Sequence, residues 1–364
     1  MSGRYSTMLS KRVCDLLESG VSYPLAAEYD VGARVKLSSN ESPLGPSPKV
    51  IEAVEREARR LSRYPDPQAR ELKGAISEYL RVDVDCIAVG NGSDELLDLI
   101  CKAFLDPGDR AVIPVPTFAM YEIACRVNGG TPEFVELKDF RWDASALIEA
   151  LADAKLAFLG RPNNPTGNGP SSRDVRRLLA SGKLVVIDEA YAEFAGYTLA
   201  GLAARKGNLL VLRTFSKAFG LAGLRVGYAI GAPEVVKVLE SIRMPFNVNR
   251  VAQAAAVAAL RDLRHVRKVV ALVRRGREYL RRELSKLGLR VLPSEANFLM
   301  VNVRPLGASA PELCAFLARE GILIRDLSGF RGAGESYVRI SVGTREENEQ
   351  LVEGIKKFKE VVGA

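Results

Sequence analysis

Short apolar runs alternate with amphipathic segments through the first two thirds of the chain. Five runs have the length and continuity of strands buried on both faces, and they cover residues 86–90, 110–115, 156–160, 183–188 and 209–214. Helical spacing of apolar positions marks the segments 93–105 and 172–182 between them. This alternation predicts an α/β fold, in which helices cover both faces of a mostly parallel sheet.

The pattern changes after about residue 247. Helical periodicity extends over residues 251–270 and 273–288, and short strand-like runs follow at 289–293, 297–303, 322–326 and 337–342, before a last helical segment over 345–362. A Pro/Gly/Ser-rich loop at residues 38–50 precedes the first strand. We therefore predict an N-terminal arm over 1–40, a large domain over 41–246 and a smaller α+β domain over 247–364.

The charge balance is basic, with 52 Lys and Arg against 44 Asp and Glu and a net charge of +8. The densest basic run, residues 261–288, interleaves with apolar positions at helical spacing, so we interpret it as a surface helix rather than a nucleic-acid patch. No apolar run approaches the roughly 18 residues of a membrane helix, and the first residues lack the apolar stretch of a secretory signal. We expect a cytoplasmic protein without a nucleic-acid or membrane partner.

Two residue counts restrict the chemistry. The five cysteines are widely spaced and contain no CxxC pair, which argues against a disulfide framework or a zinc site. His265 is the single histidine and lies in the basic run. A Ser-His-Asp triad, an HExxH site or a histidine general base would have to use it. We expect proton transfer to rest on Lys, Tyr, Asp, Glu or a cofactor.

Polar side chains follow three consecutive predicted strands. They are Asn164 after the run 156–160, Asp188 and Tyr191 at the end of 183–188, and Thr214, Ser216 and Lys217 at the end of 209–214. Singly, they have ordinary explanations: a turn before Pro165, a helix cap and a solvated loop lysine. Ligands of open α/β sheets bind at the carboxyl ends of the strands. Together the side chains fit one ligand with a protonated pyridine ring, a phenolic oxygen, an aldehyde and a phosphate.

An anion site is predicted beside these strand ends. Two glycines precede a helix that opens at Ser93 and Asp94, and backbone N–H groups at a helix N-terminus bind phosphate. The Arg225 guanidinium can contact two phosphate oxygens at once. We expect the Asp94 carboxylate to point away from the anion, because the donor at that position is its N–H.

At these residues the sequence resembles the fold-type I aminotransferases, which use pyridoxal 5'-phosphate and have a seven-stranded sheet in the large domain. The resemblance implies that Lys217 bonds covalently to the cofactor aldehyde and carries protons, while Asp188 keeps the pyridine nitrogen protonated. The other implied cofactor contacts are Asn164 and Tyr191 at the phenolic oxygen, Phe118 against the ring, and Ser93, Asp94, Thr214, Ser216 and Arg225 at the phosphate. A core phenylalanine is the alternative for Phe118.

Two other functional classes fit the sequence less well. The segment GLAGLRVG at residues 220–227 lacks the GxGxxG spacing directly after a strand, and no GxxxxGK[ST] occurs, which disfavours a nicotinamide-dependent dehydrogenase. Aminotransferase-like transcription regulators carry an N-terminal helix-turn-helix domain, and we expect the segment before Asn40 to be too short for one.

Within the superfamily, the chain is most similar to the histidinol-phosphate aminotransferase family, from about Tyr23 to the C-terminal helix. The similarity rests on the order and spacing of KLSSNESPLGPSP, RYPDPQARELKGAISEYL, RPNNPTG, IDEAYAEF, TFSKAFGLAGLRVGY, PSEANFLMVNV and VRISVGTREENE. Ser42 departs from it, since the family usually has asparagine there. The implied reaction moves an amino group between L-glutamate, which becomes 2-oxoglutarate, and imidazole-acetol phosphate, which becomes histidinol phosphate in histidine biosynthesis.

The same resemblance implies the substrate contacts and a homodimer. The substrate residues would be Tyr23, Asn40, Arg325 and Arg339, and a structural ion pair is the alternative for Arg325. Tyr64 would reach the cofactor phosphate of the neighbouring subunit. Threonine-phosphate decarboxylase, with the same fold and cofactor, and an aromatic or broad-specificity aminotransferase remain as alternative functions.

Overall fold

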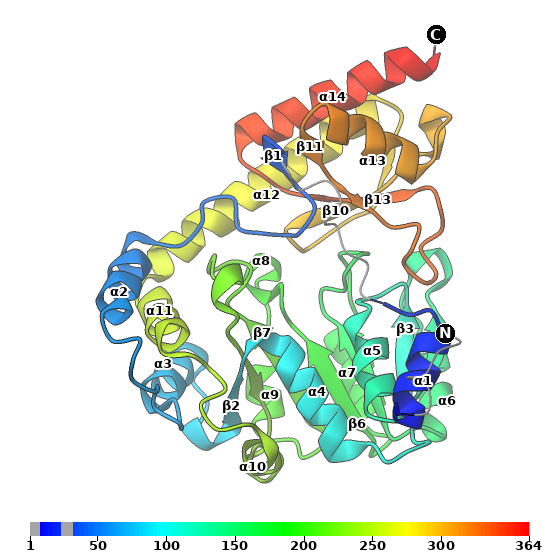
Figure 1. Cartoon of the computed structure of the whole chain (residues 1–364). Helices are drawn as coiled ribbons and strands as arrows, with labels where there is room; N and C mark the ends of the chain where they lie inside the picture. Colours follow the sequence, from blue (N-terminus) through cyan, green and yellow to red (C-terminus); the bar gives the residue numbers. More distant parts are fainter. Residues whose placement is uncertain (1–7, 23–31, 364) are drawn as a thin grey trace.

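The predicted strands assemble into a seven-stranded sheet in the computed structural model, which describes residues 8–22 and 32–363 (Figure 1). The strand order is β2 (Ile87–Gly90), β8 (Gly227–Ile230), β7 (Leu209–Thr214), β6 (Leu184–Asp188), β5 (Leu156–Gly160), β3 (Arg110–Val115) and β4 (Thr131–Glu136). Neighbouring strands run parallel, except that β8 is antiparallel to both β7 and β2. The predicted mostly parallel sheet is confirmed.

Two strands of this sheet, β4 and β8, have no clear signal in the sequence. β4 contains Pro132 and two glutamates, which an edge strand tolerates because one of its sides is not hydrogen-bonded. β8 is four residues long and begins with Gly227. Both strands are identified by their pairing partners and not by their own periodicity.

Helices cover both faces of the sheet, because successive side chains of a strand point to opposite faces. In β5, Phe158 packs in one core cluster and its neighbours Ala157 and Leu159 pack in another. The first cluster is shared with α4 (Gly92–Phe104), α5 (Met120–Val127) and α10 (Pro233–Ile242), and the second with α3 (Arg70–Leu80), α6 (Ala144–Ala152), α7 (Ser172–Leu179) and α9 (Ala200–Ala203). Each fully buried large apolar side chain contributes about 1.5–3 kcal/mol, so the two clusters hold the three layers together.

A second, four-stranded antiparallel sheet follows later in the sequence. Its order is β12 (Arg325–Asp326), β13 (Tyr337–Ser341), β10 (Phe298–Asn302) and β9 (Arg290–Val291). The helices α12 (Leu263–Lys286), α13 (Ala310–Arg319) and α14 (Arg345–Gly363) lie together on one side of it (Figure 1). On the other side, Met300 packs with Leu327 and Phe330. The predicted α+β unit is confirmed, while the domain limits at residues 40 and 246 stay predictions.

The helix break after residue 250 differs from the prediction. The helices are α11 (Arg250–Leu260), which packs on α2 (Pro48–Ala58), and α12, so the chain turns near Asp262 and continues without a break past residue 270. The side chain of Asp262 accepts the N–H of His265 and caps α12. An aspartate at an N-cap position satisfies a free helical N–H, which explains the early break.

The predicted strand 322–326 is divided into two strands that pair with different partners. Its first half, β11 (Ile322–Leu323), pairs in parallel with β1 (Val35–Lys36), while β12 pairs with β13. The N-terminal part of the chain is therefore joined to the C-terminal unit. This pairing carries residues 38–40 to the space between the two sheets.

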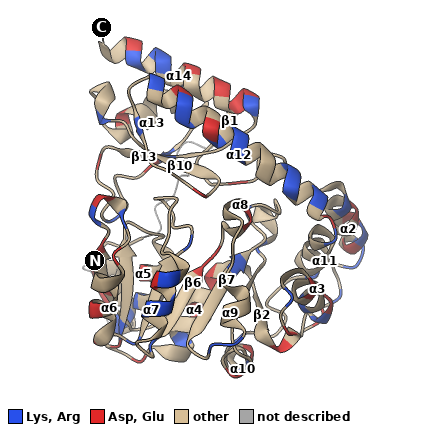
Figure 2. Cartoon of the chain, turned by 180° about the vertical axis from the view of Figure 1, so that it is seen from behind, with Lys and Arg blue, Asp and Glu red and all other residues tan. Residues whose placement is uncertain are grey.

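Charged side chains of both signs are distributed over the helices. Figure 2 shows basic and acidic residues close together along α14, and basic positions along α12. Arg282, Glu283 and Lys286 form ion pairs within α12. Among the residues that the structure describes, no helix is both long enough and apolar enough to cross a bilayer.

The start of α4 packs tightly against β8, and this contact generates a stability prediction. A Cβ atom on Gly227 would lie 2.6 Å from the backbone N of Ser93 and 2.8 Å from the carbonyl C of Gly92. We expect Gly227→Ala to lower the free energy of unfolding by about 1–3 kcal/mol, measured as the urea midpoint, because backbone must move. Gly223→Ala, where the added Cβ meets nothing within 4 Å, is the matched control. Equal midpoints for the two variants would contradict this packing.

Candidate active site

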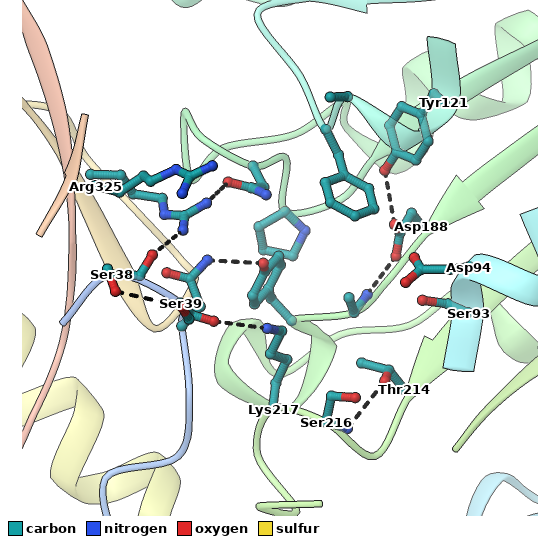
Figure 3. Close-up of a pocket in the computed structure, with 18 of the residues that line it drawn as sticks. Ser38, Ser39, Ser93, Asp94, Tyr121, Asp188, Thr214, Ser216, Lys217 and Arg325 are labelled. Carbon is teal, nitrogen blue, oxygen red and sulfur yellow. Dashed lines mark hydrogen bonds between the residues drawn. The ribbon is translucent and has the colours of Figure 1, made fainter. Parts of the chain in front are cut away.

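A cavity of about 390 Å³ opens at the carboxyl ends of β5, β6 and β7, where the large sheet faces the smaller one (Figure 3). Thirteen of the residues selected from the sequence line it: Asn40, Ser93, Asp94, Phe118, Asn164, Asp188, Tyr191, Thr214, Ser216, Lys217, Arg225, Arg325 and Arg339. Tyr23 lies outside the described residues. The sequence therefore identifies most of the wall of one cavity.

The strand order explains why these residues meet. β5, β6 and β7 are consecutive hydrogen-bonded neighbours, with Gly160 paired to Asp188 and Asp188 paired to Leu212. Parallel neighbours end at the same edge of a sheet, so the segments that follow them converge. Asn164 and Lys217 reach the cavity from loops directly after β5 and β7.

The Asp188 carboxylate lies deep in the cavity wall and is 8% exposed. Its Oδ2 accepts the hydroxyl of Tyr121 at 2.9 Å, and its Oδ1 accepts the N–H of Ala190 at 3.0 Å (Figure 3). Burial raises the pKa of Asp188 to about 6, and these two hydrogen bonds oppose the rise. A cation placed against this carboxylate would offset its burial.

Tyr121 is a site residue that the sequence reasoning missed. It lies on α5, three residues after Phe118, and the two rings meet edge to face with centroids 5.7 Å apart. Phe118 precedes α5, and the backbone N–H of Tyr121 donates to its carbonyl oxygen at 3.2 Å, so a turn brings the two rings together. Helical spacing therefore gave no signal for Tyr121. The buried phenol of Tyr121 supports both Phe118 and Asp188.

Lys217 is half-buried, and its Nζ donates to the carbonyl oxygen of Ser39 at 3.2 Å (Figure 3). Burial, followed by the positive charge of Arg339, lowers the pKa of Lys217 to about 8. A substantial fraction of this amine is therefore neutral near pH 8. A neutral, desolvated lysine amine is a nucleophile and a base.

Arg225 lines the end of the cavity beside the N-terminus of α4. Its guanidinium contacts Asp94 Oδ2 at 3.1 Å and Ser216 Oγ at 3.3 Å. Gly92 has a φ of +80° at the start of α4, and a Cβ there would lie 2.7 Å from Arg225 Nη2. The absence of a side chain on Gly92 thus lets this guanidinium lie beside the helix N-terminus.

The orientation of Asp94 differs from the prediction. Its carboxylate lines the cavity and forms an ion pair with Arg225, whereas we expected it to point away. Burial raises the pKa of Asp94, while Arg225 and Lys217 oppose the rise. The nearby positive charges explain the inward orientation. An anion entering here would compete with Asp94 for Arg225.

Arg325 and Arg339 lie opposite each other on the paired strands β12 and β13, and each is 6% exposed. Arg339 donates to Asn164 Oδ1 at 2.6 Å and to the carbonyl oxygen of Ser38 at 2.6 Å. The first bond fixes the Asn164 amide, so that its Nδ2 is the remaining donor. Guanidinium groups bind carboxylate and phosphate with paired hydrogen bonds, so this pair has the chemistry to hold an anion.

A buried ion network, also missed from the sequence, lies next to Asp188. The Glu189 carboxylate is fully buried, 3.4 Å from Arg161 and 3.6 Å from Arg213. It also accepts the N–H of Leu199 at 2.7 Å. Burial raises the pKa of Glu189, and the two arginines oppose the rise. This network holds the backbone that carries Asp188 and Tyr191.

Tyr64 and His265 lie outside the set of residues that line the cavity. Tyr64 is 76% exposed, and its ring stacks on Phe246 with centroids 4.4 Å apart. His265 Nε2 lies 3.0 Å from the carbonyl oxygen of Gly45. The expected role of Tyr64 at a neighbouring site stays a prediction.

Comparison with known proteins gives consistent similarities. The family model described as aminotransferase class I and II matches residues 33–355. The histidinol-phosphate aminotransferase of Methanopyrus kandleri is 43% identical and covers 93% of this chain and 92% of its own length.

Two solved structures resemble the fold over most of its length. That of histidinol-phosphate aminotransferase from Sinorhizobium meliloti, in complex with pyridoxal-5'-phosphate, has a TM-score of 0.87 at 28% identity and covers 98% of this chain and all of its own. That of L-threonine-O-3-phosphate decarboxylase from Porphyromonas gingivalis has a TM-score of 0.77 at 28% identity and covers 90% of this chain and 99% of its own.

Proposed function

The chain belongs to the aminotransferase class I and II family, and from that membership we propose that it is a histidinol-phosphate aminotransferase. The reaction transfers an amino group between L-glutamate and imidazole-acetol phosphate, and it proceeds in two half-reactions. The observation that carries this choice of substrate is the 43% identity with the histidinol-phosphate aminotransferase of Methanopyrus kandleri over 93% of this chain. The pair of buried arginines, Arg325 and Arg339, accounts for the anionic groups of that substrate.

The donor set of the cavity fits pyridoxal phosphate as the cofactor. Lys217 offers an amine with a lowered pKa, Asp188 offers a buried carboxylate for the pyridine nitrogen, and Phe118 offers a ring face. Ser93, Thr214, Ser216 and Arg225 would hold the phosphate at the N-terminus of α4, and Asn164 and Tyr191 would hold the phenolic oxygen. The bound cofactor supplies an aldehyde that carries the amino group and a ring that stabilises negative charge on the neighbouring carbon.

The residues of the chain supply the proton transfers and the orientation. With the cofactor bound, Lys217 Nζ would take the proton from the carbon that bears the substrate amino group and would deliver it to the cofactor carbon that bore the aldehyde. Its pKa of about 8 suits this exchange near neutral pH, since the amine is readily protonated and deprotonated there. The Asp188 carboxylate would hold the pyridine proton of the bound cofactor, and Tyr121 orients that carboxylate.

Arg325 and Arg339 account for a phosphorylated or carboxylated substrate. Histidinol phosphate carries a phosphate and glutamate carries carboxylates, and guanidinium groups bind both anions with paired hydrogen bonds. Tyr23 lies outside the described residues, and its closing over the substrate phosphate stays a prediction. A threonine-phosphate decarboxylase would need the same anion site, so the choice between the two rests on the test below.

We also propose that the protein is a homodimer. Leu61, Tyr64 and Met244 are 68%, 76% and 71% exposed, and Phe246 stacks on Tyr64. Hydrogen bonds from Arg243 and Arg250 to the carbonyl groups of Pro67 and Tyr64 hold the two segments of this patch together. A second copy would cover the patch and bring Tyr64 to the neighbouring cofactor phosphate. The cytoplasmic location expected from the sequence stays a prediction.

The substrate assignment predicts a spectral change. Adding L-histidinol phosphate to the cofactor-loaded protein, with no amino acceptor, should abolish the visible absorbance of the aldehyde form as the cofactor takes the amino group. Lys217→Ala should slow this change by roughly 10²–10⁴-fold or more. Release of CO₂ from threonine phosphate, with no response to histidinol phosphate, would instead favour the decarboxylase.

The dimer proposal predicts complementation between two inactive variants. Tyr64→Ala and Lys217→Ala proteins, unfolded and refolded together, should regain up to roughly a quarter of wild-type activity, because mixed dimers contain one site with both residues intact. Each variant refolded alone is the control. A monomer in solution, or dimers that mix without regaining activity, would contradict the shared site.

A further inference from the structure

The segment 38–40 bridges the two sheets and contacts the site with three consecutive residues. Three hydrogen bonds join it to the site. The Ser38 carbonyl accepts from Arg339 Nη2 (2.6 Å), the Ser39 carbonyl accepts from Lys217 Nζ (3.2 Å), and Asn40 Nδ2 donates to Tyr191 Oη (3.1 Å). Figure 3 shows the bond from Lys217 to Ser39 in the cavity. The first two use backbone oxygens, whereas the third uses the Asn40 side chain.

Asn40 is held in an unusual conformation by the smaller sheet. Its φ is +55°, a region that non-glycine residues seldom adopt, and it is 1% exposed. Its N–H donates to Ser341 Oγ at 2.8 Å, and its carbonyl accepts from Asn297 Nδ2 at 3.0 Å. Such a conformation persists where surrounding contacts fix it, and it is common at functional sites.

The same contacts fix the orientation of the Asn40 amide. Ser341 Oγ already accepts the backbone N–H of Asn40, so its own proton is available to donate, and it donates to Asn40 Oδ1 at 2.9 Å. In the reversed amide, Ser341 would face a second donor and lose this acceptor. Asn40 Nδ2 is therefore the atom that meets Tyr191 Oη.

A donor on Asn40 determines what Tyr191 can do. The Tyr191 oxygen accepts this N–H, so the Tyr191 proton points to another group. The rings of Tyr191 and Phe298 meet edge to face with centroids 5.1 Å apart, and this contact fixes the ring that carries the hydroxyl. The amide oxygen and one amide N–H of Asn40 are thus engaged by protein partners, which fixes the side chain against Tyr191.

We propose that Asn40 is a positioning residue, which acts through Tyr191 by directing the Tyr191 hydroxyl proton to the phenolic oxygen of the cofactor. This rests on the proposed function and replaces the substrate contact expected for Asn40. A hydrogen bond donated to the phenolic oxygen spreads its negative charge. The less negative oxygen stabilises the protonated form of the nitrogen that links Lys217 to the cofactor less strongly. The hydrogen bond from Tyr191 therefore lowers the pKa of that nitrogen.

Asn40→Gly is the variant that isolates the side chain. Glycine adopts a positive φ without strain, so the N–H and carbonyl contacts with Ser341 and Asn297 are retained while the amide is removed. We expect the pKa of the cofactor absorbance, titrated without substrate, to rise by roughly half a pH unit to one pH unit. Tyr191→Phe should raise it at least as much, and Asn40→Gly combined with Tyr191→Phe no further.

Several results would overturn the proposal. An Asn40→Gly protein with an unchanged absorbance pKa and a raised KM for histidinol phosphate would be a substrate-binding variant. Additive effects in the double variant would show that Asn40 acts independently of Tyr191. A wild-type protein that binds no pyridoxal phosphate would remove the proposed function, and this inference with it.

Ser341→Ala provides a second route to the same test. Without the Ser341 proton, the Asn40 amide can reverse and draw the Tyr191 proton to Oδ1, so the absorbance pKa should again rise. If Asn40→Gly does not fold, an unchanged absorbance pKa in Ser341→Ala overturns the proposal. The matched control is Ser328→Ala, whose hydroxyl bonds Asp326 and does not line the cavity.

Discussion

An excess of positive charge around one cavity, part of it buried, is the constraint on which the site depends. Among the residues that the structure describes, the cavity is lined by four basic side chains, Lys217, Arg225, Arg325 and Arg339, and by two carboxylates, Asp94 and Asp188. Buried charge is costly unless it is paired. The protein answers locally with the ion pair of Asp94 and Arg225, the carbonyl oxygens of residues 38 and 39, and a lowered pKa of Lys217. A cofactor and a substrate that each carry a phosphate would complete the balance, which is why the charge pattern agrees with the proposed reaction.

The segment that supplies those carbonyl oxygens connects the two sheets. β1 pairs with β11, so the residues after β1 are held by the smaller unit, yet their polar atoms bond Lys217 and Tyr191 of the large one. Movement of one unit relative to the other would therefore change contacts at the reacting amine. The backbone of residues 38 and 39 is therefore part of the site, beside the side chains that the sequence predicted.

The sequence allowed prediction of those site residues that follow strands, because strand order alone brings them together. Asn164, Asp188 and Lys217 are of this kind. Tyr121 was missed, because its contact with Phe118 arises in the turn before α5 and its bond to Asp188 spans 67 residues of sequence. The roles of Ser38 and Ser39 were not predictable, since they rest on backbone carbonyls and on the pairing of β1 with β11, two residues long on each side. The inward turn of Asp94 was missed, because it depends on the position of Arg225 across 131 residues of sequence.

The most direct test of the account is to find where the cofactor attaches. The protein loaded with pyridoxal phosphate is reduced with borohydride, which makes the linkage to lysine permanent, then digested and mapped by mass spectrometry. If Lys217 bonds to the cofactor aldehyde, the label lies on Lys217 and on no other lysine. Stoichiometric label on a different lysine, or a loaded protein without any label on Lys217, would contradict it.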